Sequence, residues 1–257
     1  MFLSQSFMYN GINSELMGVA IARTENGMIE MPFGHRREIV EEKLDKKETP
    51  YFYGFSNECL MLSITLCKLD GSSWTYEDRR KIVEWFYQEE YKPFISLDNP
   101  EVIYYCTAVG EPKRYDNGFE EGYVTLNLKC NSPYAYSPMY INTYDYKISK
   151  TNILEIDNAT NVKKYYYPEI EIEMVNGTEI SIINLTNKGE EFKFTNLKKG
   201  EIIYINNDMQ EIESSLKDTW RLSNFNKNWL KLVKGVNRLK INGNAKVAIR
   251  CCYPISI

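Results

Sequence analysis

Histidine is almost absent from this chain, which has a single one, His35, among 257 residues. The six cysteines form no CxxC pair, so a zinc site built from Cys and His ligands is not expected. The sequence also lacks a G-x-S-x-G turn, an H-E-x-x-H helix and a phosphate-binding P-loop. Nothing therefore nominates a nucleophile with a base, a metal site or a cofactor site, and no enzymatic activity is expected.

Paired carboxylates of the glycosidase kind are not evident either. The acidic pairs Glu41–Glu42, Glu89–Glu90 and Glu120–Glu121 are adjacent in sequence. Neighbouring side chains diverge in a helix and in a strand, whereas a glycosidase needs two carboxylates that face one substrate. These pairs are typical of solvated surfaces.

Long apolar runs are missing as well. No window approaches the roughly 18 apolar residues of a membrane-spanning helix, and residues 1–10 have neither the basic nor the apolar part of a signal peptide. The formal net charge is only −4, so no strong field attracts nucleic acid or an anionic membrane. We expect neither as a partner, and we interpret the six cysteines as reduced thiols of a protein made in a cytoplasm without a signal peptide.

Tyrosine, by contrast, is abundant, with 20 Tyr against 11 Phe. Its apolar ring and polar hydroxyl suit half-buried sheet faces and protein interfaces. The abundance fits an ordinary β-rich protein and an assembly protein equally well.

The first half of the chain predicts strands around one helix. Thr75 is a candidate N-cap with Asp78 three residues later, and Ile82, Val83 and Phe86 form an apolar stripe at helical spacing. One helix among strands is expected to bury such a stripe on a sheet. The predicted segments are strands at Cys59–Cys67, Lys92–Leu97, Val102–Val109 and Val124–Cys130, with a helix at Thr75–Phe86.

The second half predicts strands only. Asn131–Pro138 interrupts the pattern with two prolines, so we place the boundary near residue 140, giving domains 1–140 and 141–257. Short alternating strands follow, with Asn176–Gly177 and Asn242–Gly243 as hairpin turns and a strand at Trp229–Val233. Short strands separated by turns at this spacing favour a β-sandwich.

Residues 35–50 are dense in charge and contain three clear hydrophobic residues, Ile39, Val40 and Leu44. Charge runs of this kind usually form a solvated hairpin or helix. The segment is therefore expected outside the core.

The order of these elements, the chain length and the position of the joint resemble the phage distal tail protein family. The run from Trp229 to Gly243, with Gly235 and Asn237 before an alternating strand, resembles the end of those proteins. The resemblance implies a mainly β fold. The N-terminal domain would be a tail-tube-like β-sandwich or split barrel with one α-helix, and the C-terminal domain a galectin-like β-sandwich.

The same resemblance implies a structural virion protein at the phage tail tip: a homo-hexameric ring that joins the tail tube protein to tail tip or tail-associated proteins. Receptor-binding or baseplate proteins would contact the C-terminal domain. Residues 35–50 correspond to a projecting arm that completes the inner belt of the ring. The candidate ring-interface residues are His35, Arg36, Arg37, Glu38, Ile39, Val40, Glu41, Glu42, Lys43 and Leu44.

A carbohydrate-binding module that contacts the host surface is the alternative function. Trp220 and Trp229 are candidates for stacking on sugar rings, although tryptophans of β-sandwiches more often belong to the core. The last part of the chain is also basic, which suits either an acidic partner or a solvated surface. Its basic residues are Lys227, Lys231, Lys234, Arg238 and Lys240.

Overall fold

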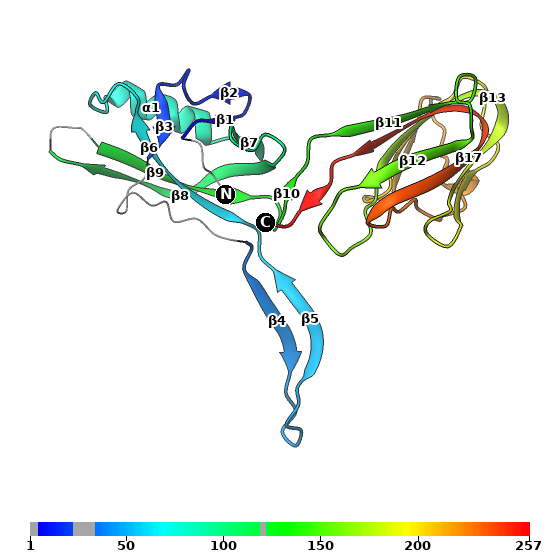
Figure 1. Cartoon of the computed structure of the whole chain (residues 1–257), viewed down its shortest axis with the longest axis horizontal. Helices are drawn as coiled ribbons and strands as arrows, with labels where there is room; N and C mark the ends of the chain where they lie inside the picture. Colours follow the sequence, from blue (N-terminus) through cyan, green and yellow to red (C-terminus); the bar gives the residue numbers. More distant parts are fainter. Residues whose placement is uncertain (1–4, 23–33, 119–121) are drawn as a thin grey trace. The chain divides into compact units, whose positions relative to one another are not determined.

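The computed structural model describes residues 5–22, 34–118 and 122–257, and the chain divides into two compact units (Figure 1). Unit 1 is Met1–Ser137 together with Ile255–Ile257, and unit 2 is Pro138–Pro254. Each unit has a hydrophobic core of its own.

Unit 1 is built on a nine-stranded sheet whose main path, β2-β1-β7-β8-β9-β6-β3, is antiparallel throughout. In β6 (Met61–Lys68) and β9 (Gly122–Cys130), Leu62 lies opposite Leu128 and Ile64 opposite Leu126, so the predicted alternation places these side chains on one buried face. The strands are β1 (Phe7–Tyr9), β2 (Ile12–Asn13), β3 (Val19–Ile21), β6 (Met61–Lys68), β7 (Lys92–Ser96), β8 (Ile103–Asp116), β9 (Gly122–Cys130), β10 (Ala135–Tyr136) and β18 (Pro254–Ile255).

Helix α1 (Tyr76–Phe86) begins with the predicted capping box. The Thr75 hydroxyl accepts a hydrogen bond from the Asp78 amide, and the Asp78 carboxylate accepts one from the Thr75 amide, both at 3.1 Å. Lys68 Nζ of β6 donates to the same carboxylate at 2.8 Å. The start of the helix is therefore tied to the sheet.

The buried face of α1 differs from the prediction at one position. Val83, predicted in the apolar stripe, is 42% exposed, and Trp85 is buried instead. The Trp85 ring stacks on Phe7 with 5.6 Å between ring centroids, and its Nε1 donates to the Tyr9 carbonyl at 3.0 Å. The observed face follows the i, i+3, i+4 spacing of neighbours on a helix. Its buried residues are Ile82, Trp85 and Phe86.

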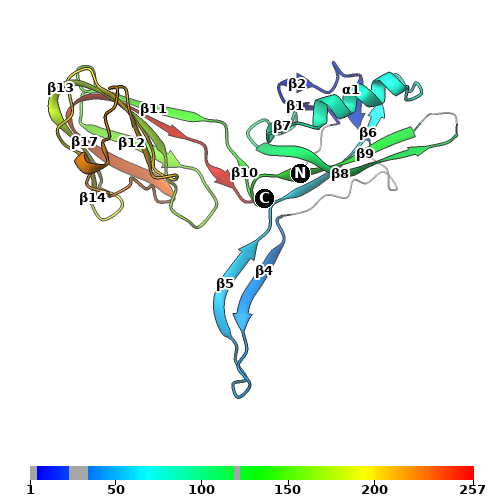
Figure 2. The same cartoon turned by 180° about the vertical axis from the view of Figure 1, so that it is seen from behind.

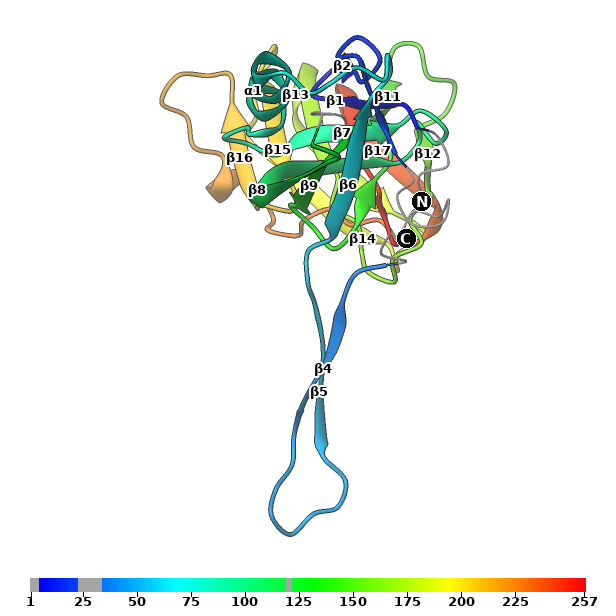
Figure 3. The ribbon, with the colours of Figure 1, turned by 90° about the vertical axis from the view of Figure 1, so that its left-hand side faces the viewer.

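A separate two-stranded sheet projects from unit 1 (Figure 3). Its two strands come after β3 and before β6 along the chain. It consists of β4 (Arg37–Glu42) and β5 (Tyr51–Asn57) in antiparallel pairing. Among the described strands, these two pair only with each other.

Unit 2 contains a seven-stranded antiparallel sheet in which two long strands form the centre. The first half of the long strand β13 (Glu169–Asn184) pairs with β15, and its second half pairs with β14. In the other long strand, β17 (Gly235–Cys251), the first half pairs with β12 and the second half with β11 (Figure 2). The strands are β11 (Tyr140–Asp145), β12 (Ile153–Asn158), β13 (Glu169–Asn184), β14 (Glu190–Phe194), β15 (Ile202–Asn206), β16 (Glu211–Ser214) and β17 (Gly235–Cys251), and the 3₁₀ helix η1 is Leu222–Asn224.

The predicted hairpin turns Asn176–Gly177 and Asn242–Gly243 are wrong, because both lie inside these long strands. The pairing of β13 with β17 continues across them with register shifts that mark bulges. Bulges bend strands, and both halves contribute to one core. Gly243 is needed at the bend, because a Cβ there would lie 2.7 Å from the Glu179 carbonyl oxygen.

The predicted strand Trp229–Val233 is also wrong. Only an isolated bridge between Leu232 and Tyr166 interrupts this irregular segment. The alternation of apolar and polar residues nevertheless corresponds to burial, because Leu230 and Leu232 are buried. A period-2 pattern therefore reports burial of alternate side chains here without a ladder of backbone hydrogen bonds.

The chain crosses between the units twice. It leaves unit 1 after Ser137 and returns after Pro254. β18 then pairs with β10, and Ile257 packs on the core of unit 1. No pattern in the sequence pointed to this return.

Candidate functional site

The projecting hairpin is the most unusual surface of the described chain. We call β4, β5 and their connection, residues 37–57, the arm. Every residue of β4 is exposed, and Figure 3 shows the arm extending away from the body of unit 1. A two-stranded hairpin on its own is at best marginally stable in water. The arm is therefore expected to gain stability from something that covers it.

One face of the arm is apolar. Ile39 lies directly opposite Phe55, so the two side chains share a face, and the Phe52 ring contacts the Phe55 ring at 5.1 Å. We call these three residues the apolar face of the arm. Ile39 is 59% exposed, Phe52 60% and Phe55 47%. Clustered exposed apolar side chains mark interaction surfaces more often than chance.

Charged groups of the arm and its base contact either this face or one another. The Arg37 guanidinium lies 3.4 Å from the centre of the Phe55 ring, a cation–π contact. Arg36 pairs with Glu38 at 2.6 Å and approaches Glu58 at 3.8 Å. Such exposed ion pairs contribute little to stability, so they do not replace the burial that the arm lacks.

The ten candidate interface residues lie in the arm or beside it. His35 and Arg36 precede β4, six residues form β4, and Lys43 and Leu44 follow it. The structure thus brings them together in one hairpin strand and its two ends. Their contact with another chain stays a prediction.

Sequence reasoning missed the second strand of the arm. The predicted arm ended at residue 50, whereas β5 continues the hairpin to Asn57 and carries its largest apolar side chains. The available signal was the aromatic run that follows Pro50, since aromatic residues favour strands and this run has few alternating polar partners. The exposed aromatic residues of β5 are Tyr51, Phe52, Tyr53 and Phe55.

His35 lies at the base of the arm, where its ring edge meets the Tyr134 ring at 5.5 Å. Its Nδ1 atom is buried without a hydrogen-bond partner in the described part of the chain. No group of three or more His, Cys, Asp or Glu residues that could hold a metal occurs among residues 5–22, 34–118 and 122–257. Within the same ranges, no helix has the length and apolar character required to cross a membrane. The acidic pair Glu120–Glu121 lies outside the described residues.

The two tryptophans considered for sugar stacking have different environments in unit 2. Trp229 packs edge-on against Phe225 at 4.8 Å and is partly buried on the core. Trp220 is 87% exposed. Only Trp220 presents a free aromatic face.

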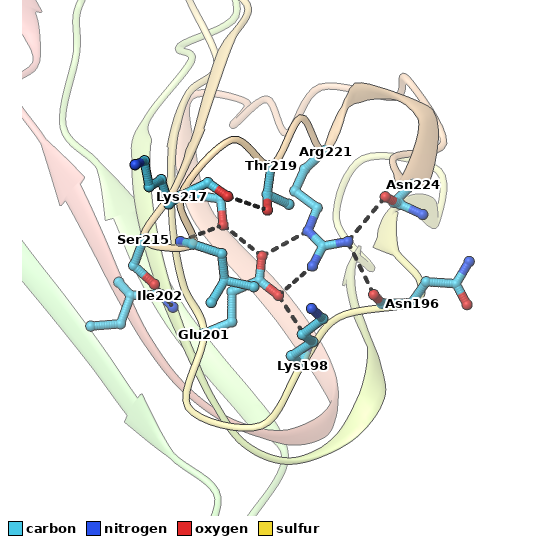
Figure 4. Close-up of polar contacts among 11 residues, drawn as sticks. Asn196, Lys198, Glu201, Ile202, Ser215, Lys217, Thr219, Arg221 and Asn224 are labelled. Atoms are coloured by element: carbon cyan, nitrogen blue, oxygen red, sulfur yellow. Dashed lines mark hydrogen bonds and ion pairs between the residues drawn. The ribbon is translucent and has the colours of Figure 1, made fainter.

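A buried ion pair anchors the residue next to Trp220 (Figure 4). Arg221 donates through Nε and a terminal nitrogen to the two carboxylate oxygens of Glu201, both at 2.7 Å. Arg221 also donates to the Asn196 carbonyl and to the Asn224 side chain. This bidentate arrangement fixes the segment that carries Trp220.

The carboxylate of Glu201 is fully buried, yet its pKa is lowered. Burial alone would raise the pKa, but the hydrogen bonds from Arg221, from the Lys198 amide and from the Ser214 hydroxyl outweigh that effect. The group is therefore an ionised structural anchor and not a proton donor poised for catalysis.

The basic residues near the end of unit 2 are partly neutralised. Lys231 pairs with Glu190 at 3.0 Å, and Arg238 pairs with Glu155 at 3.2 Å. These contacts favour the solvated-surface interpretation of the basic patch over an acidic partner.

Models of phage tail domains match nearly the whole chain. One, described as a phage tail protein N-terminal domain, matches residues 2–132, and another, described as a phage tail C-terminal domain, matches residues 134–251. The chain belongs to this family of phage tail proteins. It is also 26% identical over 250 residues to the SPbeta prophage-derived protein YomH of Bacillus subtilis strain 168, with 97% of each chain covered.

Solved structures show the fold of this phage tail protein in other phages. The SPP1 Dit protein, described as a paradigm of the hub adsorption apparatus in phages that infect Gram-positive bacteria, matches with a TM-score of 0.68 and 14% identity, over 96% of this chain and 98% of that one. A chain of the phage P2 baseplate in its activated conformation with Ca matches with a TM-score of 0.50 and 9% identity, over 97% and 98%. The predicted resemblance to distal tail proteins is confirmed, and so is the mainly β fold in two units, with one α-helix among the described residues.

Proposed function

We propose that this phage tail protein is a distal tail hub: six copies form a ring at the tail tip. The observation that supports this most directly is the exposed arm on a chain that has the fold of SPP1 Dit over nearly its full length. The protein is then a structural virion component made in the host cytoplasm, with no enzymatic role and no cofactor.

The arm supplies the contact between neighbouring copies in this proposal. Each arm lays its apolar face, Ile39, Phe52 and Phe55, on the body of unit 1 of the next copy. Head-to-tail contacts of this kind close into a ring when the rotation per copy fits. Burial of large apolar side chains is favourable by roughly 1.5–3 kcal/mol each, and six repeated contacts would add.

The proposed ring has three kinds of further partner. The tail tube protein lies on one side and the tail tip or tail-associated protein on the other. Receptor-binding or baseplate proteins attach through unit 2, for which we retain a galectin-like β-sandwich as the proposed description.

Light scattering of the purified protein tests the ring. We expect a particle of six times the 30.2 kDa chain mass and a ring in negative-stain images. The double variant Phe52→Ser/Phe55→Ser should shift the protein to monomer without loss of its circular dichroism signal. The control is Leu185→Ser in unit 2, a residue 46% exposed, which should leave the ring intact. A monomer at high concentration together with no ring on assembled tails contradicts the proposal.

A carbohydrate-binding module remains the second candidate, and the exposed Trp220 on a rigid anchor favours it. The test is a glycan array that includes host cell-wall polysaccharides, with wild-type protein and Trp220→Ala. Binding by a monomeric wild-type protein that disappears in Trp220→Ala supports this function over the hub. Absence of binding by a hexameric protein supports the hub.

A further inference from the structure

Two thiols face each other inside unit 1. Cys106 of β8 lies directly opposite Cys130 of β9, and both are free and fully buried. They sit in the core under α1, where the Tyr9 hydroxyl donates to the Cys106 carbonyl at 3.1 Å. The pair is not used by the arm, by the Trp220 segment or by the proposed ring.

The backbone pattern shows which kind of cross-strand pair this is. The Asn131 amide donates to the Tyr105 carbonyl at 2.9 Å. Asn131 follows Cys130 and Tyr105 precedes Cys106, so this hydrogen bond joins the pair of residues next to the two cysteines. Cys106 and Cys130 thus occupy a non-hydrogen-bonded site, where Cα atoms are about 4.5 Å apart and side chains are closest. That separation lies within the range of about 4.4–6.8 Å that disulfides span.

We propose that Cys106 and Cys130 are a modification site that closes to a cross-strand disulfide under oxidising conditions. The oxidant is a small peroxide. One thiol attacks the peroxide O–O bond to give a sulfenic acid and water. The second thiol then displaces the sulfenic oxygen as water and forms the S–S bond. Two thiols lose two electrons and two protons in total, and one hydrogen peroxide becomes two waters.

The position of the pair makes the reaction selective and slow. A hydrogen bond with Cys130 and burial raise the pKa of the Cys106 thiol, which lowers its thiolate fraction and its rate of attack. Cys251 is also buried, but the residue directly opposite it is Tyr140, which provides no second thiol. A facing thiol, and not reactivity, therefore determines which cysteine forms an intramolecular disulfide.

Membership of a phage tail family indicates when the two thiols would meet oxidising conditions. A tail protein is made in a reducing cytoplasm and is exposed to oxidising surroundings after the host lyses. The disulfide would lock the β8–β9 register after assembly, when the sheet must persist without resynthesis.

Peptide mass spectrometry of the full-length folded protein tests the inference. The protein is treated with dilute hydrogen peroxide, denatured, alkylated and digested without reductant. We expect one linked peptide pair that contains Cys106 and Cys130. These two of the six thiols should no longer react with the alkylating reagent. The melting temperature of unit 1 should rise by about 5 °C or more.

Two variants make the result decisive. Cys130→Ala should abolish the linked pair and the rise in melting temperature, whereas Cys251→Ala should retain both. If Cys130→Ala fails to fold, the wild-type digest alone still decides. Linkage of Cys106 to Cys130 only after denaturation, or modification of the partly exposed Cys59, Cys67 and Cys252 with this pair still reduced after prolonged treatment, overturns the proposal.

Discussion

At the scale of single residues, the buried pair Arg221–Glu201 is the contact with the largest expected effect on stability. Arg221→Met leaves the Glu201 carboxylate buried without its partner, which should cost about 3–5 kcal/mol of unfolding free energy. Urea unfolding followed by circular dichroism measures this cost. The control is Arg238→Met, which breaks an exposed ion pair and should cost less than about 1 kcal/mol. Equal losses in the two variants would mean that the buried pair does not anchor its loop.

Asp78 gives a pH-dependent prediction at the same scale. A hydrogen bond from Lys68, then one from the Thr75 amide, lower its pKa from 3.8 to about 2. A lowered folded-state pKa stabilises the fold above the unfolded value, and that stability is lost as the pH falls from about 4 towards 2. Asp78→Asn should therefore cost about 1 kcal/mol at pH 7, and its difference from wild type should shrink over that range.

The control for Asp78 is Glu77→Gln, which changes a neighbouring first-turn carboxylate outside the capping box. Its urea midpoint should follow that of wild type at every pH. A difference between Asp78→Asn and wild type that is constant from pH 7 to pH 2.5 would contradict the assignment.

At the scale of elements, local signals were sufficient for some predictions and insufficient for others. The capping box at Thr75 and the alternation around Leu126 were read correctly, because each depends on residues close in sequence. The Asn176–Gly177 and Asn242–Gly243 dipeptides were misread, because Asn-Gly permits positive φ at bulges as well as in hairpin turns. Only the pairing of β13 with β17 over a long sequence separation distinguishes these cases.

The arm shows the same limit for the candidate site. The charge of residues 35–50 predicts a solvated hairpin or helix outside the core, but does not choose between the two. The second strand, β5, is missed because an aromatic strand resembles a core strand until its exposure is known. No periodicity reports which partner, if any, covers an exposed face.

Removal of the whole arm is the prediction at this scale. Replacing residues 37–57 by two glycines should leave both units folded, because no arm residue belongs to either hydrophobic core. The far-UV circular dichroism and urea midpoint should stay close to wild type, while light scattering should show monomer. A ring that survives this deletion would rule out the arm as the contact between copies.

At the scale of the whole molecule, we predict no hydrolase activity. The described residues bring His35 against Tyr134, and the buried carboxylate of Glu201 is held ionised by Arg221. Catalysis requires a nucleophile, base or metal at workable geometry. Purified protein incubated with peptidoglycan and cell-wall glycan fragments should release no products by chromatography. Turnover that is lost when one Asp or Glu is changed to its amide would overturn the structural role.

The double crossing between the units has a consequence for gene exchange. Along the chain, unit 2 is inserted into unit 1, because Ile255–Ile257 return to unit 1 after unit 2 ends. A recombination event that replaces everything beyond the joint also replaces Ile257, which packs on the unit 1 core. A transplanted second unit must therefore carry a closing strand that fits a sheet inherited from another parent.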